Sequence, residues 1–329
     1  MTIETVHSAG QTLPQSSMND ASSPTFSSSL SSSRGAPLVA VDWGTSSLRG
    51  ARLDAGGRVV DARSAARGIL TVGPGEFPAV FDALFGDWMR EPGTRCLISG
   101  MAGSKQGWIE APYCACPAGI DDVAAEIVTV AADIAMVPGL ASEAGGVPDV
   151  MRGEEVQIFG AIALTGRRDG VFVLPGTHNK WVRVADGRVA GFRTFMTGEF
   201  YALLGTQSIL ARTVDTTAAL DEAAFLRGVA LARNGCGLLH NAFGARTLSL
   251  FGRMQAGALA SYLSGLLIGE ELQAQDLQAG TEVVLIGSPQ LTRRYALALD
   301  DRGILSRTLG AEATWAGLHA LHQRKTLPR

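Results

Sequence analysis

Two Gly-Thr turns, one in each half of the chain, constrain its fold more than any other feature of the sequence. Gly44-Thr45 follows the apolar run 38–41, and Gly176-Thr177 follows the apolar run 170–174. In both places further short apolar runs come next, separated by turn residues, which is the pattern of an antiparallel meander of strands. Each half of the chain therefore has a meander that begins with a Gly-Thr turn. This repetition predicts an internal duplication of the strand topology.

Helices and strands alternate around these meanders. Apolar residues at offsets of 0, 3, 4, 7, 8 and 11 predict a helix over 77–88. Residues 99–108 form a loop punctuated by glycine. The other expected strands are 95–98, 134–139 and 282–286, and the other expected helices are 121–132, 151–164, several between 198 and 275, one from 291 and one near 313–321. The chain is therefore predicted to be an α/β protein.

Length predicts more than one domain. At roughly 150 residues per domain, a chain of 329 residues corresponds to two. We place the boundary after residue 150, which gives the segments 38–150 and 151–329. Residues 1–37 differ from both, because eleven of them are serine and one is aromatic. Such a segment buries too little apolar surface to offset the entropy lost on ordering, so we expect a disordered tail.

Charge and cysteine content exclude several classes of protein. A net charge of −3 is unlike that of a dedicated nucleic-acid binder. Four cysteines are too few for a disulfide scaffold, so we interpret all of them as reduced packing thiols. The longest stretch without a charged residue, 254–269, has 16 residues, and a membrane span needs about 20. Residues 1–37 also lack the apolar segment of a secretory signal, so we expect a cytoplasmic protein without membrane partners.

The two turns are candidate phosphate-binding loops. The chain has no Gly-x-Gly-x-x-Gly fingerprint, no P-loop and no hydrolase elbow, so a nucleotide would need another cradle. Backbone N–H groups of a strand–strand turn can point into one concavity that suits phosphate oxygens, and glycine allows close approach. The hydroxyls of Thr45, Ser46 and Thr177 add donors. Asp42, at the end of the strand before the first turn, is placed to hold Mg²⁺ or its waters.

A pair of acidic residues marks a second candidate site. Glu154 and Glu155 begin the helix expected at the junction between the two halves. Acidic residues at a helix start are also favoured by the helix dipole alone. Moreover, Gly269-Glu270-Glu271 repeats the tripeptide Gly153-Glu154-Glu155 within another helix. The position of the first copy at the junction, and not the tripeptide itself, therefore supports a functional role.

Polar residues near the turns complete the set. Only three lysines are present, and two of them, Lys105 and Lys180, fall in the glycine-rich loop and the second turn. Each is either a cation that faces a phosphate or carboxylate, or a solvated loop residue. His178 lies in the same turn as Lys180 and is either structural or part of the site. Glu199 lies at a polar helix start, where it is either a cap or a site residue.

Taken together, these blocks resemble the sugar-kinase, heat-shock-70 and actin superfamily, and more closely the 2-dehydro-3-deoxygalactonokinase family. The most specific blocks are Met-Arg-Gly-Glu-Glu at 151–155 and Pro-Gly-Thr-His-x-Lys-Trp-Val at 175–182. The resemblance also covers 40–49, 101–104, 192–199 and 263–269. It implies two duplicated ribonuclease-H-like (actin-like ATPase) domains, with ATP and substrate in the interdomain cleft.

The resemblance also implies roles for the motifs. The two Gly-Thr turns would be the two phosphate motifs, with Asp42 near Mg²⁺, and Gly287-Ser288 is similar to the adenosine motif. Many superfamily members carry an acidic residue in the second phosphate motif, whereas this chain has Pro175 and Gly176 there. In kinases of the glycerol-kinase type the base is an aspartate in a Gly-Asp helix start, and Gly153-Glu154 matches that placement. Glu154 is therefore the expected base, with Glu155 as its rival.

The expected reaction is transfer of the γ-phosphoryl group of ATP to the terminal hydroxyl of 2-dehydro-3-deoxygalactonate, giving the 6-phosphate. The residues that we assign to the substrate, including the candidates for its carboxylate, are Arg49, Ser104, Lys105, Arg152, His178, Arg193 and Glu199. Two alternatives stay open: a kinase of the same fold for another sugar acid or sugar, and a non-catalytic nucleotide-dependent sensor or actin-like assembly protein. A homodimer is also possible.

Overall fold

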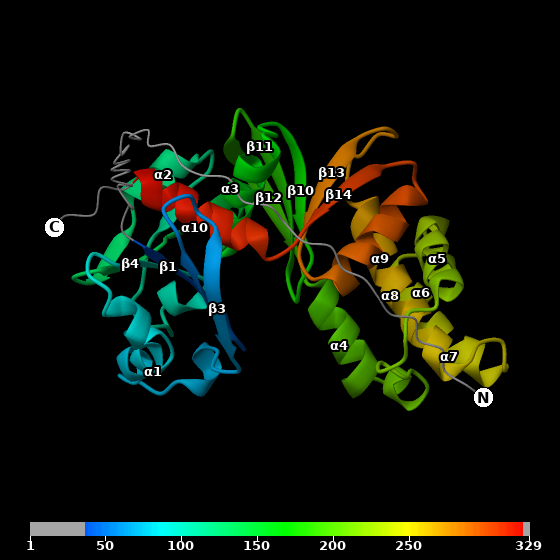
Figure 1. Ribbon diagram of the computed structural model, residues 1–329. Coiled ribbons are helices and arrows are strands. Elements are labelled where there is room, and N and C mark those ends of the chain that lie inside the picture. The colour runs from blue at the N-terminus through cyan, green and yellow to red at the C-terminus, as the bar shows by residue number, and fades with distance from the viewer. Residues whose placement is uncertain (1–36, 325–329) are drawn as a thin grey trace, which may run out of the picture. The chain divides into compact units, whose positions relative to one another are not determined.

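The computed structural model of the protein describes residues 37–324 (Figure 1). Its first sheet opens with the antiparallel strands β1 (Leu38–Trp43), β2 (Leu48–Leu53) and β3 (Val59–Ala65). Strands β4 (Arg95–Ser99) and β7 (Ile134–Met136) extend it from β1 as parallel neighbours, and β6 (Val128–Ala131) closes it as an antiparallel edge. The strand order is β3-β2-β1-β4-β7-β6.

The second sheet repeats this topology. Strands β10 (Gly170–Leu174), β11 (Asn179–Ala185) and β12 (Arg188–Phe195) form the antiparallel meander. Strands β13 (Glu282–Ile286) and β14 (Leu305–Leu309) then join β10 as parallel neighbours, so that the order is β12-β11-β10-β13-β14. The predicted duplication of the meanders is confirmed. Strand β14 was not expected, because its side chains are mostly exposed and it carries no continuous apolar run.

A small third sheet departs from the sequence prediction. It consists of β5 (Tyr113–Ala115) and the hairpin β8 (Gly139–Ala144) and β9 (Val147–Met151). We expected a strand over 134–139 and a helix from 151, but β7 ends at Met136 and the helix begins only at Glu154. The hairpin turns at Gly145 and Gly146, whose positive φ angles of 61° and 75° suit glycine. Its largely exposed strands lack an apolar pattern, which explains the error.

The helix expected over 121–132 is also shorter than predicted. It ends as α2 (Ile120–Ala125), and the chain continues as strand β6. The run Val128-Thr129-Val130 is β-branched, and such residues favour strands over helices. The remaining helices are α1 (Phe77–Met89), α3 (Glu154–Thr165), α4 (Thr197–Gln207), α5 (Glu222–Leu231), α6 (Leu238–Asn241), α7 (Phe243–Leu250), α8 (Ala256–Gln273), α9 (Pro289–Asp300) and α10 (Glu312–Arg324).

Most of the uncharged stretch 254–269 lies in α8, which is buried along most of its length. Within residues 37–324, no helix has the length and apolar character needed to cross a membrane. All four cysteines are free, with Cys96 and Cys114 buried and Cys116 half-buried. The prediction of a packing role is wrong for Cys236, which is exposed in a loop between two glycines of positive φ. The serine-rich tail predicted for 1–37 lies outside the described residues except for Pro37.

Two helix pairs cross at glycines. In Figure 1, α10 lies beside α3 and against β1. A Cβ atom added to Gly160 of α3 would lie 1.7 Å from the carbonyl oxygen of Ala313, and one added to Gly317 of α10 would lie 1.9 Å from that of Val156. The pair α5 and α8 makes the same reciprocal contact through Gly228 and Gly265. In both pairs the helix backbones pack directly against each other at these glycines. The domain boundary after residue 150 stays a prediction.

We predict that Gly160→Ala destabilises the protein by about 1–3 kcal/mol, because the added methyl group has no room against the backbone of α10. Urea unfolding followed by circular dichroism measures this. Gly257→Ala in α8 is the control, since its methyl group would meet only the methyl group of Ala218 at 3.0 Å. Equal stability of Gly160→Ala and the wild type would contradict the tight crossing.

Candidate active site

The first part of the site is the end of β1. Asp42 lies opposite Arg49 of β2 and Ser99 of β4 in the strand register, and Arg49 Nη2 donates a hydrogen bond to Asp42 Oδ2. The Asp42 side chain is 13% exposed. Gly100, with φ 92°, passes so close that an added Cβ would lie 2.8 Å from the Trp43 carbonyl oxygen. A side chain is excluded there, which leaves one edge of Asp42 bordered by bare backbone.

The turn after β1 is held rigidly and presents hydroxyl groups. The Gly44 N–H donates to the Ser47 carbonyl (2.9 Å), and the Ile69 and Leu70 N–H groups donate to the carbonyls of Gly44 (3.1 Å) and Thr45 (3.3 Å). Thr45 and Ser46 are themselves exposed. The carbonyls of Gly44 and Thr45 are therefore engaged, while Thr45 and Ser46 are exposed and can meet a ligand through their hydroxyl groups.

The start of α3 meets this region through a second glycine. Gly153 has φ 103°, and an added Cβ would lie 3.2 Å from the Cα atom of Gly100. The contact between the two glycines brings the first carboxylates of α3 near Asp42. Glu154 Oε2 accepts the Arg152 N–H at 3.0 Å, and both oxygens of Glu155 accept the Gly153 N–H, at 2.7 and 3.0 Å.

The two carboxylates differ in electrostatic setting. Burial raises the pKa of Glu154, while the positive charge of Lys180 lowers it and the negative charge of Asp42 raises it. Glu154 therefore lies within electrostatic reach of two other predicted site residues. Glu155 is fully buried, and burial together with the charge of Glu154 raises its pKa to about 8. At neutral pH Glu155 is mostly protonated.

The second turn joins β10 and β11. The Gly176 N–H donates to Asn179 Oδ1 at 2.7 Å, so this donor of the predicted phosphate cradle is already engaged. Thr177 and His178 are exposed. His178 Nε2 lies 2.5 Å from Glu199 Oε2 at the start of α4, so two of the predicted substrate residues do come together. Lys180, only 6% exposed, donates to Thr194 Oγ1 at 2.8 Å.

The buried carboxylate of Glu271 ties the second turn to α8 through hydrogen bonds. Glu271 of α8 is 3% exposed and accepts hydrogen bonds from Asn179 Nδ2 (2.8 Å) and the Tyr295 hydroxyl (2.6 Å). It also accepts from Trp181 Nε1 and the Thr197 hydroxyl. We discounted this tripeptide copy in the sequence. A detectable signal was its position two residues after the uncharged stretch 254–269, beside the apolar residues Ile268 and Leu272, which are buried.

The adenosine-like motif lies next to the second turn. A Cβ added to Gly287 would lie 3.4 Å from the Pro175 carbonyl oxygen, and Ser288 is the exposed residue before α9. A pocket of about 220 Å³ opens here between the turn, α4, α8 and α9. Its lining includes Gly176, Asn179, Tyr201, Ser264, Arg294 and Tyr295. Gly176 and Gly287 are thus brought to one place, as the predicted nucleotide motifs require.

The candidates for the substrate carboxylate separate in space. Arg152 is buried, donates to the Ala111 carbonyl at 2.8 Å and stacks on the Tyr113 ring at 4.2 Å. Within the described part of the chain, its Nη1 atom and the buried hydroxyl of Ser104 have no hydrogen-bond partner. Lys105 is exposed.

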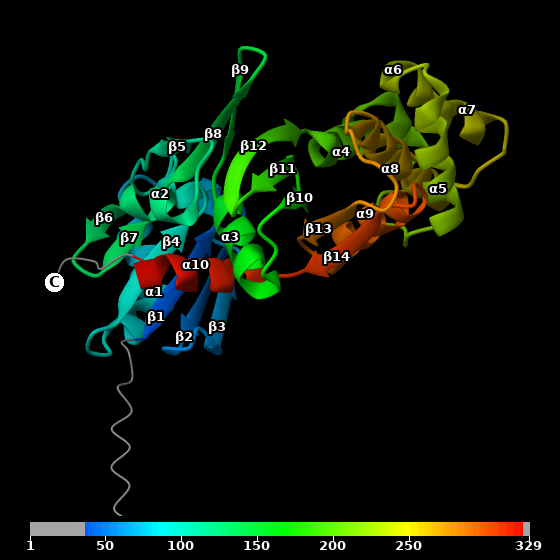
Figure 2. The ribbon, with the colours of Figure 1, turned by 90° about the horizontal axis from the view of Figure 1, so that it is seen from above.

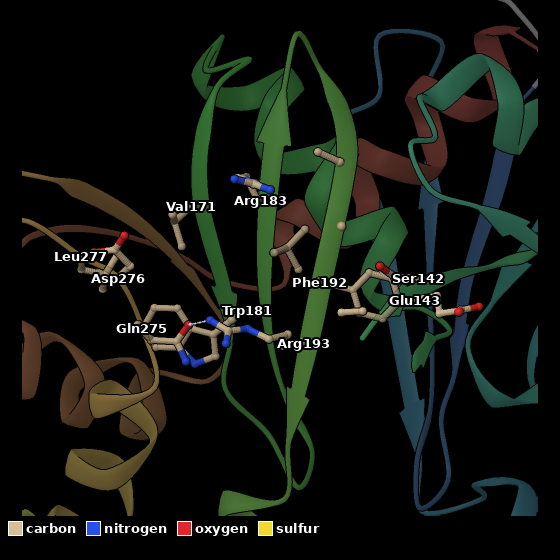
Figure 3. A pocket seen from close by; sticks show the side chains of 14 residues that line it. Ser142, Glu143, Val171, Trp181, Arg183, Phe192, Arg193, Gln275, Asp276 and Leu277 are labelled. Atoms are coloured by element: carbon tan, nitrogen blue, oxygen red, sulfur yellow. Dashed lines mark hydrogen bonds between the residues drawn. The ribbon is translucent and has the colours of Figure 1, made fainter. Parts of the chain in front are cut away.

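Arg193 lies apart from this group. Its Nη2 atom donates to the Ala274 carbonyl (2.9 Å) and to Gln275 Oε1 (3.1 Å), beside a pocket of about 460 Å³ (Figure 3). Successive residues of a strand point to opposite faces, so Arg193 faces away from Thr194 and Lys180. The structure does not bring Arg193 together with Glu154.

The comparisons with known proteins decide the family. A family model described as 2-keto-3-deoxy-galactonokinase matches residues 42–321. The chain belongs to the 2-keto-3-deoxy-galactonokinase family. It is 40% identical over 292 residues to a protein of Rhizobium meliloti provisionally named 2-dehydro-3-deoxygalactonokinase, covering 86% of this chain and 95% of the relative. The 2-dehydro-3-deoxygalactonokinase of Escherichia coli is 32% identical over 289 residues, with coverages of 87% and 97%.

A solved structure agrees with this assignment. The crystal structure of a protein from Sinorhizobium meliloti, provisionally assigned as a 2-dehydro-3-deoxygalactonokinase, is 38% identical and superimposes with a TM-score of 0.80. The match covers 87% of this chain and 98% of that chain. The resemblance to this family and the predicted α/β fold with a duplicated meander are confirmed.

We predict that Glu271→Gln destabilises the protein by about 1–3 kcal/mol, because an amide cannot accept all four hydrogen bonds and places an NH₂ group against donors. Glu270→Gln is the matched control, since Glu270 makes only a 3.4 Å contact with Asn241. Urea unfolding of the three proteins measures the difference. Equal loss in both variants would contradict the role of Glu271 as the support of the second turn.

The raised pKa of Glu155 predicts a pH-dependent stability. The folded protein binds a proton at Glu155 up to about pH 8, whereas the unfolded chain releases it above its ordinary value of 4.5. This stabilisation is complete below pH 4.5 and is lost as the pH rises through 8. Glu155→Gln stays neutral, so its stability relative to the wild type should rise across this window, by at most about 1.4 kcal/mol per pH unit. Thermal melts from pH 5 to 9, with the exposed Glu143→Gln as control, check this; a pH-independent difference would exclude it.

Proposed function

We propose that this chain phosphorylates the terminal hydroxyl of 2-dehydro-3-deoxy-D-galactonate with ATP, giving the 6-phosphate. Family membership makes it a carbohydrate kinase, and relatives at 32–40% identity carry the name of this activity. The observation that carries the proposal is the convergence of Glu154, Asp42 and Lys180. A base, a magnesium-binding carboxylate and a cation are the groups that phosphoryl transfer to an alcohol needs.

Glu154 fits the role of the base better than Glu155. Both oxygens of Glu155 are engaged with the Gly153 N–H, and its raised pKa keeps it protonated at neutral pH. Glu154 accepts the Arg152 N–H through Oε2 at 3.0 Å. Burial raises the pKa of Glu154, and the positive charge of Lys180 opposes that rise. Glu154 can therefore accept the proton of the substrate hydroxyl as that oxygen attacks the γ-phosphorus in line.

The donor set fits a magnesium ion carried by the nucleotide. Residues 37–324 contain no group of three acidic, histidine or cysteine side chains that could enclose a metal. Mg²⁺ commonly binds through one or two carboxylates together with phosphates and water, so Asp42 alone suffices as the protein ligand. The ion, when bound, neutralises phosphate charge. Arg49, paired with Asp42 here, would then be free to contact a phosphate or the substrate.

The nucleotide would lie between the two turns. Thr45 and Ser46 offer hydroxyl donors on the first turn, and Thr177 offers one on the second. The pocket of about 220 Å³ beside Gly176 and Gly287 would take the nucleoside, with Tyr201 and Arg294 in its walls. Arg152 and Ser104 are the candidates that best suit the substrate carboxylate, because both carry buried polar atoms without a partner in the described chain.

A second sugar acid is the alternative substrate. The epimer 2-dehydro-3-deoxygluconate differs at one hydroxyl, and the exposed pair His178 and Glu199 is available to contact sugar hydroxyls. A non-catalytic sensor, the alternative from another class, gains no support from the family membership.

We predict ADP release from Mg-ATP that depends on 2-dehydro-3-deoxygalactonate, at a higher kcat/KM than with the gluconate epimer. Glu154→Gln should lower kcat by about 10²–10⁴-fold, because the base is lost while the shape is kept. ATP affinity, measured by calorimetry, should change little. Glu155→Gln is the matched comparison and should keep most of its activity.

Two results would contradict this assignment. A loss of turnover in Glu155→Gln with full turnover in Glu154→Gln would exchange the two roles. A wild-type protein that releases no ADP with any sugar acid would exclude the proposed reaction.

A further inference from the structure

A carboxylate that the proposed mechanism does not use lies behind Lys180. Asp149 belongs to β9, and the hairpin β8–β9 runs beside the edge strand β12 (Figure 2). Asp149 Oδ2 accepts the Thr194 N–H at 2.7 Å, and Asp149 Oδ1 accepts the Thr194 hydroxyl at 2.6 Å. Asp149 Oδ1 also accepts the Val150 N–H at 2.8 Å. Each oxygen of Asp149 thus binds Thr194, on the side of β12 that has no neighbouring strand in its sheet.

The hydroxyl of Thr194 then has a fixed direction. A threonine hydroxyl carries one proton, and an ionised carboxylate can only accept. The proton therefore lies in the bond from Thr194 to Asp149, which leaves the oxygen as an acceptor for the ammonium group of Lys180 at 2.8 Å. Lys180 and Thr194 are directly opposite in the register of β11 and β12, so the short contact needs no distortion.

Lys180 needs such support. It is only 6% exposed, and burial disfavours a charged ammonium group unless acceptors or negative charges surround it. Thr194 supplies an acceptor, and the charge of Lys180 acts on Glu154, the proposed base. The Thr194 hydroxyl donates to Asp149 and accepts from Lys180. It therefore links the ammonium group to the negative charge of Asp149 through two successive hydrogen bonds.

We propose that Asp149 and Thr194 are positioning residues, which hold the ammonium group of Lys180 where the transferred phosphoryl group meets Glu154. This inference rests on the proposed function, because the phosphoryl group is the partner that it assigns to Lys180. The competing explanation is that Asp149 only ties the hairpin to the edge of the sheet. The two explanations differ in what removal of the Thr194 hydroxyl does while its backbone N–H remains.

Chemical labelling of lysine tests, without any substrate, whether Asp149 and Thr194 hold Lys180 in place. The chain has only three lysines, so an amine-reactive reagent followed by mass spectrometry reports each of them separately. In the wild type, exposed Lys105 should react much faster than Lys180. Thr194→Val and Asp149→Asn should speed the reaction of Lys180 by about tenfold, as expected for a released side chain. Thr194→Ser, which keeps the hydroxyl, should not.

The control for these variants is Asp169→Asn. Asp169 also accepts a backbone N–H, that of Asp186 in the turn between β11 and β12, at 2.8 Å. It precedes β10, whereas Leu174, which pairs with Lys180, is at the other end of that strand. Unchanged labelling of Lys180 in both Thr194→Val and Asp149→Asn would overturn the proposal. Thermal melting confirms that each variant is folded.

Kinetics decide between positioning and a structural tie. Thr194→Val should lower kcat by about ten- to a hundredfold, with the KM values of ATP and sugar acid within about twofold, because a misplaced group costs rate more than binding. Thr194→Ser should retain the wild-type kcat. In a Lys180→Met background, Thr194→Val should have no further effect on kcat, since its partner is gone.

The outcomes separate the two proposals. A wild type that is active, with unchanged kcat in Thr194→Val or with additive losses in the double variant, overturns the positioning role alone. A wild type inactive towards every sugar acid overturns the proposed function and the assignment of Lys180 with it.

Discussion

The close approach of Gly100 and Gly153 is the contact on which the candidate site depends. Both glycines have positive φ angles, and a Cβ on Gly153 would lie 3.2 Å from the Cα atom of Gly100. Gly100 follows β4, beside Asp42, and Gly153 precedes α3. A side chain at either position would separate the carboxylate of Asp42 from those at the helix start. Backbone against backbone is therefore what lets a strand end and a helix start share one site.

Burial raises the pKa of two carboxylates, Glu271 and Glu155, which differ in the hydrogen bonds that they accept. Burial raises the pKa of Glu271, and the four hydrogen bonds that it accepts oppose that rise. For Glu155, burial and the negative charge of Glu154 outweigh the hydrogen bond from the Gly153 N–H and raise the pKa to about 8. The hydrogen bonds of Glu271 join Asn179, next to the second Gly-Thr turn, to α8 and to Tyr295 of α9. A protonated Glu155 removes one negative charge from the place where phosphates are expected.

Local patterns predicted most of the fold, because short stretches of sequence determine where meanders, turns and amphipathic helices form. The strand run before each Gly-Thr turn and the face 77–88 of α1 are of this kind. The hairpin β8–β9 escaped detection, because its exposed strands have no apolar pattern.

The site was predicted less completely, because its decisive contacts join residues far apart in the chain. The partners of Glu271 include Asn179 and Tyr295, and no periodicity relates them. Alternation along β12 would have separated Arg193 from Thr194, but only the register with β11 shows that Thr194, and not Arg193, faces Lys180.

The choice of lysine at position 180 follows from the charges around it. Asp42 pairs with Arg49, while Lys180 acts on Glu154 and is joined to Asp149 through Thr194. An arginine at 180 would present a planar fork that suits bidentate pairing with a carboxylate, and would be drawn into a closed ion pair. A lysine ammonium is a compact charge with three donors, so it can bind Thr194 and keep donors for an incoming phosphoryl group. Most cationic side chains of this protein are arginine. The ability to bind Thr194 and a phosphoryl group at once explains why position 180 carries a lysine.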